Sequence, residues 1–120
     1  MPMKPPDPLA GLSASMQRAT ETMHKRHNPA GHMLGRLQTL IANFQSKMSE
    51  ESEIGVTVVG GGSDGSFHLR QIRASDPDML IFSGIDERGR NVQLLQHHSQ
   101  MSVMLIEMPK IEEKPYRIGF

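Results

Sequence analysis

Four arginines and two adjacent histidines in the second half of the chain are the side chains best suited to hold a ligand. Guanidinium groups bind phosphate through paired hydrogen bonds, and imidazole donates or accepts a proton near neutral pH. The pattern predicts a phosphate-binding rim made of Arg70, Arg73, Arg88 and Arg90, with His97 and His98 as further ligand-binding candidates. Acidic residues stand beside these arginines, so an ordinary solvated face is the alternative interpretation.

The histidine pair needs a bend in the backbone to act in one place. Adjacent residues of an extended chain point to opposite faces, so His97 and His98 cannot both line one pocket on a straight strand. A kink between two strands would let one imidazole face a rim or a neighbouring subunit. In the alternative interpretation, the pair caps the turn by hydrogen bonding.

Two other patterns have functional and structural interpretations. Gly60, Gly62 and Gly65 match the spacing of the dinucleotide-binding fingerprint, but that motif requires a helix directly after the glycines. The residues that follow have strand character, so we expect a hairpin turn. His24 and His27 share a helix face, yet Lys25 and Arg26 between them repel a cation, so we expect no metal site.

The remaining side chains give no basis for catalysis. The chain contains no cysteine, which excludes thiolate chemistry, disulfides and zinc fingers. Five glutamates lie in polar linkers where we expect them to be solvated, with nothing to raise their pKa; they are Glu50, Glu51, Glu53, Glu112 and Glu113. We therefore expect no enzyme, no catalytic residues and no cofactor.

Two helices should precede these candidate residues, because apolar positions recur at intervals of three and four. The first stripe comprises Leu9, Leu12, Met16, Ala19 and Met23. Pro29 disfavours helix at the residue before it and Gly31 is a natural terminator, so this helix should end near His27. The second stripe comprises Leu34, Leu37, Ile41, Phe44 and Met48, which predicts a second helix from about position 34.

The rest of the chain alternates between β-forming segments and turn residues. The predicted strands are 55–59, 66–73, 79–85, 91–96 and 101–108. Pro109 should end the last strand. It leaves a charged segment in which Tyr116, Ile118 and Phe120 are available for docking.

These elements predict one α+β domain, because 120 residues are too few for two cores. Two N-terminal helices should be followed by a five-stranded, strongly bent antiparallel sheet or a small barrel, since short strands must hide their edges. The expected organisation is a flexible proline-rich tail at 1–8, a helical arm at 9–33, a helix plus five-stranded β domain at 34–108, and a C-terminal tail at 109–120.

The charge balance is neutral overall but uneven along the chain. Thirteen basic residues oppose thirteen acidic ones, with a net charge of +3 over residues 1–36 and −3 over residues 37–120. No apolar run is long enough to span a bilayer, and no signal peptide follows the N-terminus. We therefore expect a cytoplasmic protein with no membrane contact. Strand edges and heptad-spaced stripes predict a homo-oligomer.

The order of one helix and five strands, with a short turn between the last two, resembles the Sm-like fold of Hfq-type bacterial RNA chaperones. The segment Gln96–Val103 stands where that family has a Tyr-Lys-His stretch at its RNA pore, and only the histidine has a counterpart, at His97 or His98. The resemblance implies a small SH3/Sm-like barrel that binds RNA. The segment Val92–Met101, with Leu80–Gly84 before it, is similar to a family of short bacterial proteins known only as a domain of unknown function.

Two functional hypotheses follow. The first is a non-enzymatic, oligomeric small-β-barrel binding module for RNA or a nucleotide-like ligand. The alternative is a protein–protein interaction module, such as an adaptor or inhibitor encoded by a phage or other mobile element. Ten methionines favour this alternative, because thioether side chains suit adaptable surfaces.

Overall fold

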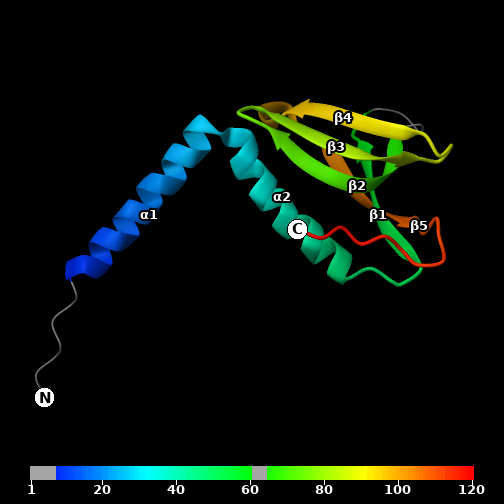
Figure 1. The fold of residues 1–120 in the computed structure, drawn as a ribbon, viewed down its shortest axis with the longest axis horizontal. Coiled ribbons are helices and arrows are strands. Elements are labelled where there is room, and N and C mark those ends of the chain that lie inside the picture. The colour runs from blue at the N-terminus through cyan, green and yellow to red at the C-terminus, as the bar shows by residue number, and fades with distance from the viewer. Residues whose placement is uncertain (1–7, 61–64) are drawn as a thin grey trace, which may run out of the picture.

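The computed structural model describes residues 8–60 and 65–120. Its elements are α1 (Pro8–His27), α2 (Pro29–Ser46), β1 (Ser52–Val58), β2 (Ser66–Ser75), β3 (Met79–Asp86), β4 (Asn91–His97), the short 3-10 helix η1 (His98–Gln100) and β5 (Val103–Pro109). Figure 1 shows α1 extending away from a body formed by α2 and the sheet. The predicted tail up to residue 7 and the turn residues 61–64 lie outside the described residues.

The helix boundary falls at Asn28, and the reason is capping. The Asn28 side chain accepts a hydrogen bond from the Gly31 N–H at 3.0 Å, and Pro29 occupies the first helical turn. Gly31 therefore lies inside α2, and the expectation that it ends a helix was wrong. The predicted end of the first helix at His27 is confirmed. The second helix starts at Pro29, before the position 34 that its apolar stripe indicated.

The five strands form one antiparallel sheet in the order β4-β3-β2-β1-β5. This confirms the predicted α+β class with a bent, five-stranded antiparallel sheet. The small SH3/Sm-like barrel that the resemblance implied is not formed, because β4 and β5 do not pair and remain as two open edges. A register shift between Leu69 and Gln71 marks a bulge in β2 that bends the strand.

The predicted strands match the observed ones, with shifted ends. The largest shift is in β1, which begins at Ser52 because Ser52 and Glu53 pair with Pro109 and Met108 of β5. The polar character of residues 50–53 had suggested a linker. The element that follows Gly65 is the strand β2 and not a helix, and β1 and β2 are antiparallel neighbours.

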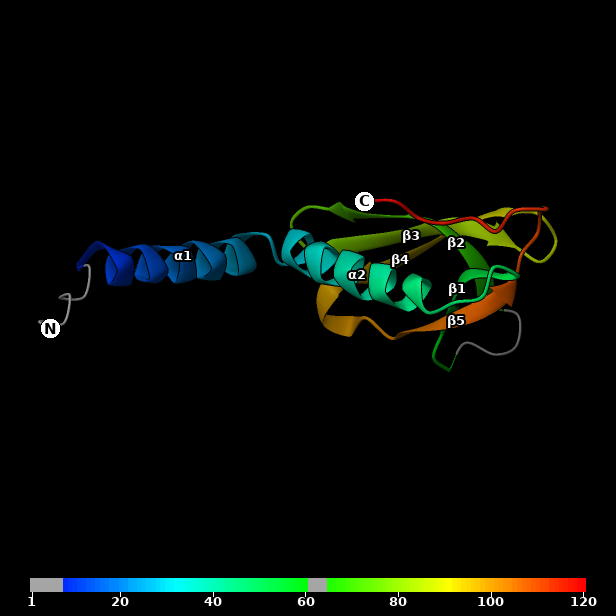
Figure 2. The same ribbon diagram turned by 90° about the horizontal axis from the view of Figure 1, so that it is seen from below.

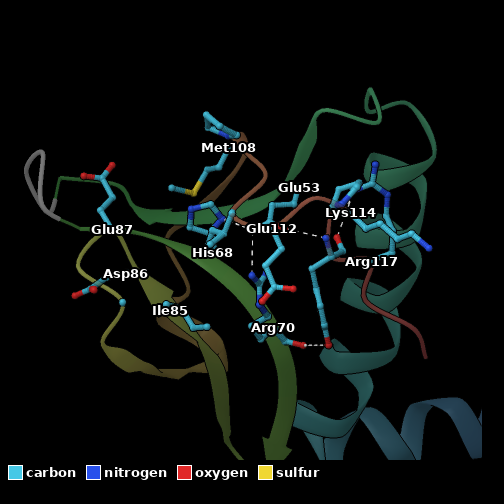
Figure 3. A pocket seen from close by; sticks show the side chains of 15 residues that line it. Glu53, His68, Arg70, Ile85, Asp86, Glu87, Met108, Glu112, Lys114 and Arg117 are labelled. Carbon is cyan, nitrogen blue, oxygen red and sulfur yellow. Dashed lines mark hydrogen bonds and ion pairs between the residues drawn. The ribbon is translucent and has the colours of Figure 1, made fainter.

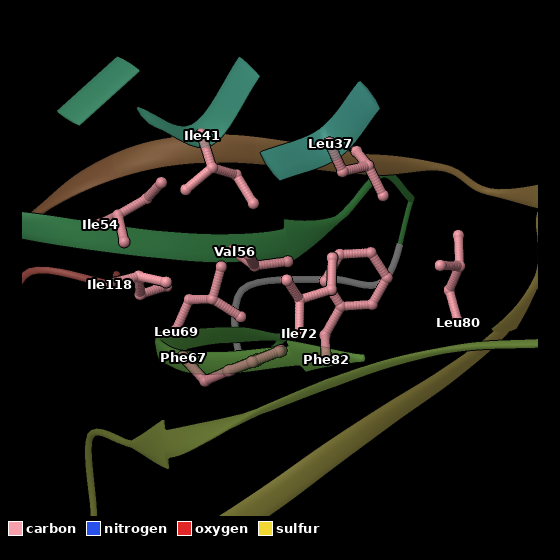
Figure 4. Packing of buried hydrophobic residues seen from close by; sticks show 10 residues of the cluster. All are labelled: Leu37, Ile41, Ile54, Val56, Phe67, Leu69, Ile72, Leu80, Phe82 and Ile118. Carbon is pink, nitrogen blue, oxygen red and sulfur yellow. The ribbon is translucent and has the colours of Figure 1, made fainter. Parts of the chain in front are cut away.

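The core lies between α2 and one face of the sheet. Figure 2 shows α2 lying along the sheet, and Figure 4 shows Leu37 and Ile41 of α2 among Ile54, Val56 and the other apolar side chains of that face. Alternation along the strands puts every second residue on this face. The opposite face of β1 and β2 is left to the polar side chains described below. Among the described helices, none is long and apolar enough to cross a membrane.

The C-terminal segment 110–120 runs over the body without regular secondary structure. Ile118 is buried in the core, and its backbone N–H and carbonyl bond to the Gln45 side chain at 2.9 and 3.1 Å. Tyr116 bonds to β1 and β2, whereas Phe120 stays 57% exposed. Two of the three residues that sequence analysis singled out for docking are therefore docked.

Candidate functional site

A cavity of about 750 Å³ opens at one end of the sheet, where β1, β2, β3 and β5 meet the C-terminal segment. We call it the Glu53 cavity, and Figure 3 shows its lining side chains. Polar groups of β1 and β2 stand beside apolar side chains that include Ile85, Met108 and Ile111. The lining also carries charges of both signs, from Lys114, Arg117, Glu87 and Glu112.

Glu53 is the most constrained side chain of this cavity. It lies next to Ile54 in β1 and therefore faces away from the core, yet it is only 1% exposed. One carboxylate oxygen, Oε1, contacts His68 Nδ1 at 2.5 Å and Arg70 Nη2 at 3.1 Å. The other, Oε2, accepts the Tyr116 backbone N–H at 2.8 Å. Three segments of the chain are thus joined through one carboxylate.

These partners determine the ionisation of Glu53. Burial raises the pKa of the Glu53 carboxyl, but the Tyr116 N–H, the Arg70 guanidinium and the His68 hydrogen bond together outweigh burial. The pKa consequently lies below its ordinary value of 4.5. Glu53 is therefore a carboxylate near neutral pH, paired with Arg70.

Arg70 connects the carboxylate with the C-terminal segment. It lies at the bulge of β2, and bulges re-aim side chains relative to a regular strand. Its guanidinium stacks on the Tyr116 ring at 4.4 Å from the ring centre, and the Tyr116 hydroxyl donates to the Arg70 carbonyl at 3.1 Å. Its Nη1 atom is buried and has no hydrogen-bond partner within the described chain.

His68 is fixed in orientation by the same carboxylate. It is 6% exposed, and only its Nδ1 atom has a hydrogen-bond partner among the described residues. When Nδ1 donates to Glu53, the neutral ring leaves Nε2 as an acceptor. The cavity can therefore orient a polar group by hydrogen bonding to Nε2 of an imidazole whose Nδ1 is held by Glu53.

The six predicted ligand-binding residues do not form one rim. Arg70 lines the Glu53 cavity, and Arg88 and Arg90 lie in the β3–β4 turn at the same end of the sheet. Asp86 of this turn also lines the cavity, and it holds Arg90 through an ion pair of 2.7 Å. The backbone N–H of Arg90 is the main cause that lowers the pKa of Asp86.

The other three predicted residues lie toward the opposite end of the sheet. Arg73 pairs with Ile81, and Ile81 pairs in turn with Leu95 of β4. His97 ends β4, and its Nδ1 accepts the Ser99 N–H at 3.2 Å, so this ring caps η1 as the turn-capping interpretation predicted. The His97 and His98 rings lie 4.6 Å apart. Within the described residues, no three potential metal ligands gather into a cluster.

Sequence analysis missed Glu53, His68 and Tyr116 as members of a site. The expectation that Glu53 lies in a solvated linker was wrong, because β1 begins before it and the C-terminal segment covers it. One signal was present: Glu53, the last residue of the acidic stretch 50–53, directly precedes the apolar run of β1. Its three partners come from distant parts of the sequence, so no local pattern could have named them.

Comparisons with known proteins add no relative. No family model, no curated protein and no solved structure matches the chain. The functional argument therefore rests on the geometry of the Glu53 cavity and on the surfaces of the sheet.

Proposed function

We propose that this chain is a non-enzymatic binding module that works as a homo-oligomer and binds a nucleotide-like small ligand in the Glu53 cavity. The observation that carries the proposal is the combination of fixed polar groups and apolar walls in one cavity. Its volume of about 750 Å³ suits a ligand of that size. Among the described lining residues there is no serine, threonine or cysteine that could attack a bound substrate as a nucleophile. The lining therefore favours ligand binding over nucleophilic catalysis.

Each part of such a ligand has a matching group. His68 and Arg70 supply hydrogen-bonding atoms for the edge of a polar ring. Ile85 and Met108 supply apolar contact for the ring itself. Lys114 provides a cation for a phosphate, because its side chain is exposed and has no ion-pair partner in the described part of the chain.

The distribution of cations favours a single nucleotide over an RNA strand. Affinity for a strand depends on several phosphate contacts along one surface. The candidate cations form two separate groups, one of Arg70, Arg88 and Arg90 and one of Arg73, His97 and His98. They therefore offer no continuous line of positive charge for an RNA backbone to follow. RNA binding is therefore an outcome to be tested beside nucleotide binding.

The test is a calorimetric titration with mononucleotides and with a short single-stranded RNA at low salt. We expect Lys114→Ser to weaken mononucleotide binding about tenfold, a loss of about 1.4 kcal/mol. Arg73→Ser, a matched loss of one cation outside the cavity, should leave it unchanged. The absence of binding by every mononucleotide contradicts the proposal. Binding of RNA alone, weakened by Arg73→Ser and steeply by salt, would favour an RNA-binding surface that includes Arg73 instead.

A second candidate is the protein-interaction module, and the observation that favours it is the edge strand β5. Its first four residues, Val103–Ile106, are apolar and uncharged, and Met104 is 50% exposed. Such an edge can accept an extended segment of a partner with alternating apolar side chains. Crosslinking in cells with peptide mapping should place links to one partner protein on β5. Links only between copies of this chain contradict this function.

A further inference from the structure

The His68 ring keeps one nitrogen in contact with the Glu53 cavity. Its Nδ1 atom is held by Glu53, and the residue is only 6% exposed. Within the described residues, Arg70 Nη1 is the side-chain nitrogen that is both buried and without a partner. His68 Nε2 also lacks a partner there, so this atom is not buried and faces the space of the cavity that His68 lines. A ligand that bonds to the His68 ring therefore does so at Nε2.

The chemical role of Nε2 follows from the partner of Nδ1. The Tyr116 backbone N–H at 2.8 Å and the Arg70 guanidinium at 3.1 Å hold Glu53 as a carboxylate. A carboxylate only accepts hydrogen bonds, so Nδ1 carries a hydrogen and donates it. In a neutral ring Nε2 is then an acceptor, and the matching ligand group is an N–H or O–H donor.

Apolar side chains flank this acceptor. His68 pairs with Gly55 of β1 on one side and with Ile85 of β3 on the other. A Cβ atom at Gly55 would overlap the side chain of Met108, so Met108 lies over that glycine. Figure 3 shows the His68 ring between Met108 and Ile85. A ligand donor that reaches Nε2 leaves water, which makes a matched hydrogen bond strong and a missing one costly.

The charges around Nε2 disfavour an anionic group there. The carboxylate of Glu53 contacts the ring directly. Three further carboxylates line the cavity, those of Asp86, Glu87 and Glu112. An anionic oxygen at Nε2 would add another negative charge beside them. An uncharged donor is therefore the ligand group that matches His68.

Arg70 determines what stands next to that donor. Its guanidinium bonds to the same Glu53 oxygen as the His68 ring, so the two groups lie side by side. A guanidinium only donates hydrogen bonds. When arginine reads base edges it pairs with the oxo group of guanine, whereas carboxamides pair with adenine. A ring N–H beside a carbonyl therefore suits His68 and Arg70 together.

We propose that the ligand carries an oxo base of the guanine or uracil type, whose ring N–H donates to His68 Nε2 and whose neighbouring carbonyl faces Arg70. This inference rests on the proposed function, because it defines the base of the nucleotide in the Glu53 cavity. The phosphate is left to Lys114 on the C-terminal segment.

The ligand class is tested by calorimetric titration of the natural chain, so no variant has to fold. Guanosine or uridine monophosphate should bind at least about tenfold more tightly than adenosine and cytidine monophosphate. Methylation of the donating ring nitrogen of either nucleotide should weaken its binding by about tenfold or more. Methylation of the ribose 2′-oxygen is the matched control, because it adds the same group away from the ring edge. It should change the affinity by less than about threefold.

The outcomes separate this inference from the proposed function. Equal affinity for the ring-methylated and unmethylated nucleotides overturns the inference and leaves nucleotide binding intact. Tightest binding of adenosine or cytidine monophosphate overturns the oxo class. No binding by any mononucleotide overturns the proposed function and this inference together.

The state of the His68 ring is tested by nuclear magnetic resonance of ¹⁵N-histidine-labelled protein at about pH 8, where an ordinary imidazole is neutral. We expect the hydrogen of His68 on Nδ1. His97 is the internal control with the opposite tautomer, because its Nδ1 accepts the Ser99 N–H. Addition of the nucleotide should shift the Nε2 signal of His68 and leave that of His97 unchanged. A hydrogen on His68 Nε2 in the free protein overturns the inference.

Discussion

At the residue scale, Glu53 is the position on which most of the site depends. Its carboxylate holds His68, Arg70 and the backbone of Tyr116 at once. A buried carboxylate is tolerated only where its charge is paired and its oxygens accept hydrogen bonds. The orientation of the polar groups in the cavity therefore follows from this one side chain.

Replacing Glu53 with glutamine should cost about 3 kcal/mol of unfolding free energy, because Arg70 then loses its charged partner in a buried site. Urea unfolding measures the loss. Glu51→Gln is the matched control, since Glu51 is 79% exposed and its ion pair with Lys110 should contribute less than about 0.5 kcal/mol. Equal losses in the two variants would contradict the role assigned to Glu53.

The lowered pKa of Glu53 predicts acid sensitivity of definite sign. A carboxyl whose pKa is lower in the folded chain stabilises it above the unfolded value of 4.5. That stability is lost as the pH falls through the folded pKa. The unfolding free energy should therefore decrease on acidification below 4.5, and less steeply in Glu53→Gln. Parallel pH profiles of the two proteins would argue against this linkage.

At the scale of elements, the C-terminal segment is part of the body although it forms neither helix nor strand. It contributes several lining residues of the Glu53 cavity, including Lys114 and Tyr116. Arg117 donates to the carbonyls of Ser52 and Ser49 at 2.7 and 2.9 Å. The segment therefore forms one side of the site next to the four strands that line the rest of it.

The anchor of this segment is Ile118, and Ile118→Ala should destabilise the chain by about 2–3 kcal/mol, because it leaves a cavity in the core. Ile111→Ala removes the same atoms from a residue of the same segment that is 51% exposed, and should change stability by less than about 0.5 kcal/mol. Thermal and urea unfolding compare the two. A small effect of Ile118→Ala would mean that the segment is not anchored through its core contact.

The bend of the sheet also has a local cause. A Cβ atom at Gly84 would overlap the His68 carbonyl oxygen, so only glycine allows β3 to lie this close to β2. The bulge near Arg70 lies beside this approach. The same irregularity that bends β2 therefore places Arg70 in the cavity.

At the scale of the whole molecule, the chain consists of a body and a projecting helix, with extents of 68 × 33 × 21 Å. Dilute protein should therefore be cleaved by trypsin first after Arg18, Lys25 or Arg26, leaving a resistant fragment that ends at Phe120. Mass spectrometry identifies the products. Arg88 is also exposed, but Asp86 accepts the backbone N–H groups of Arg88 and Arg90, which orders that turn. Cleavage after Arg88 as fast as in α1 would contradict the division of the chain into a resistant body and a projecting helix.

Local patterns predicted the elements well, because each helix or strand depends on spacing within a few residues. The stripe of Leu37 and Ile41 and the strands β3 and β4 needed no distant information. Boundaries set by capping or by cross-strand pairing were less predictable. Asn28 ends one helix and begins the next through its own side chain, and β1 starts at Ser52 because β5 pairs with it.

The sequence by itself determined the α+β class, two helices, five strands and an apolar set large enough for one core, because periodicity and turn residues act locally. Only the tertiary structure decided that the sheet stays open and that Glu53, His68, Arg70 and Tyr116 meet. Glu53 and Tyr116 are 63 residues apart, and their contact depends on how β5 and the C-terminal segment fold back over β1. Burial of a charged residue is a property of that packing, which residue type and neighbouring sequence do not contain.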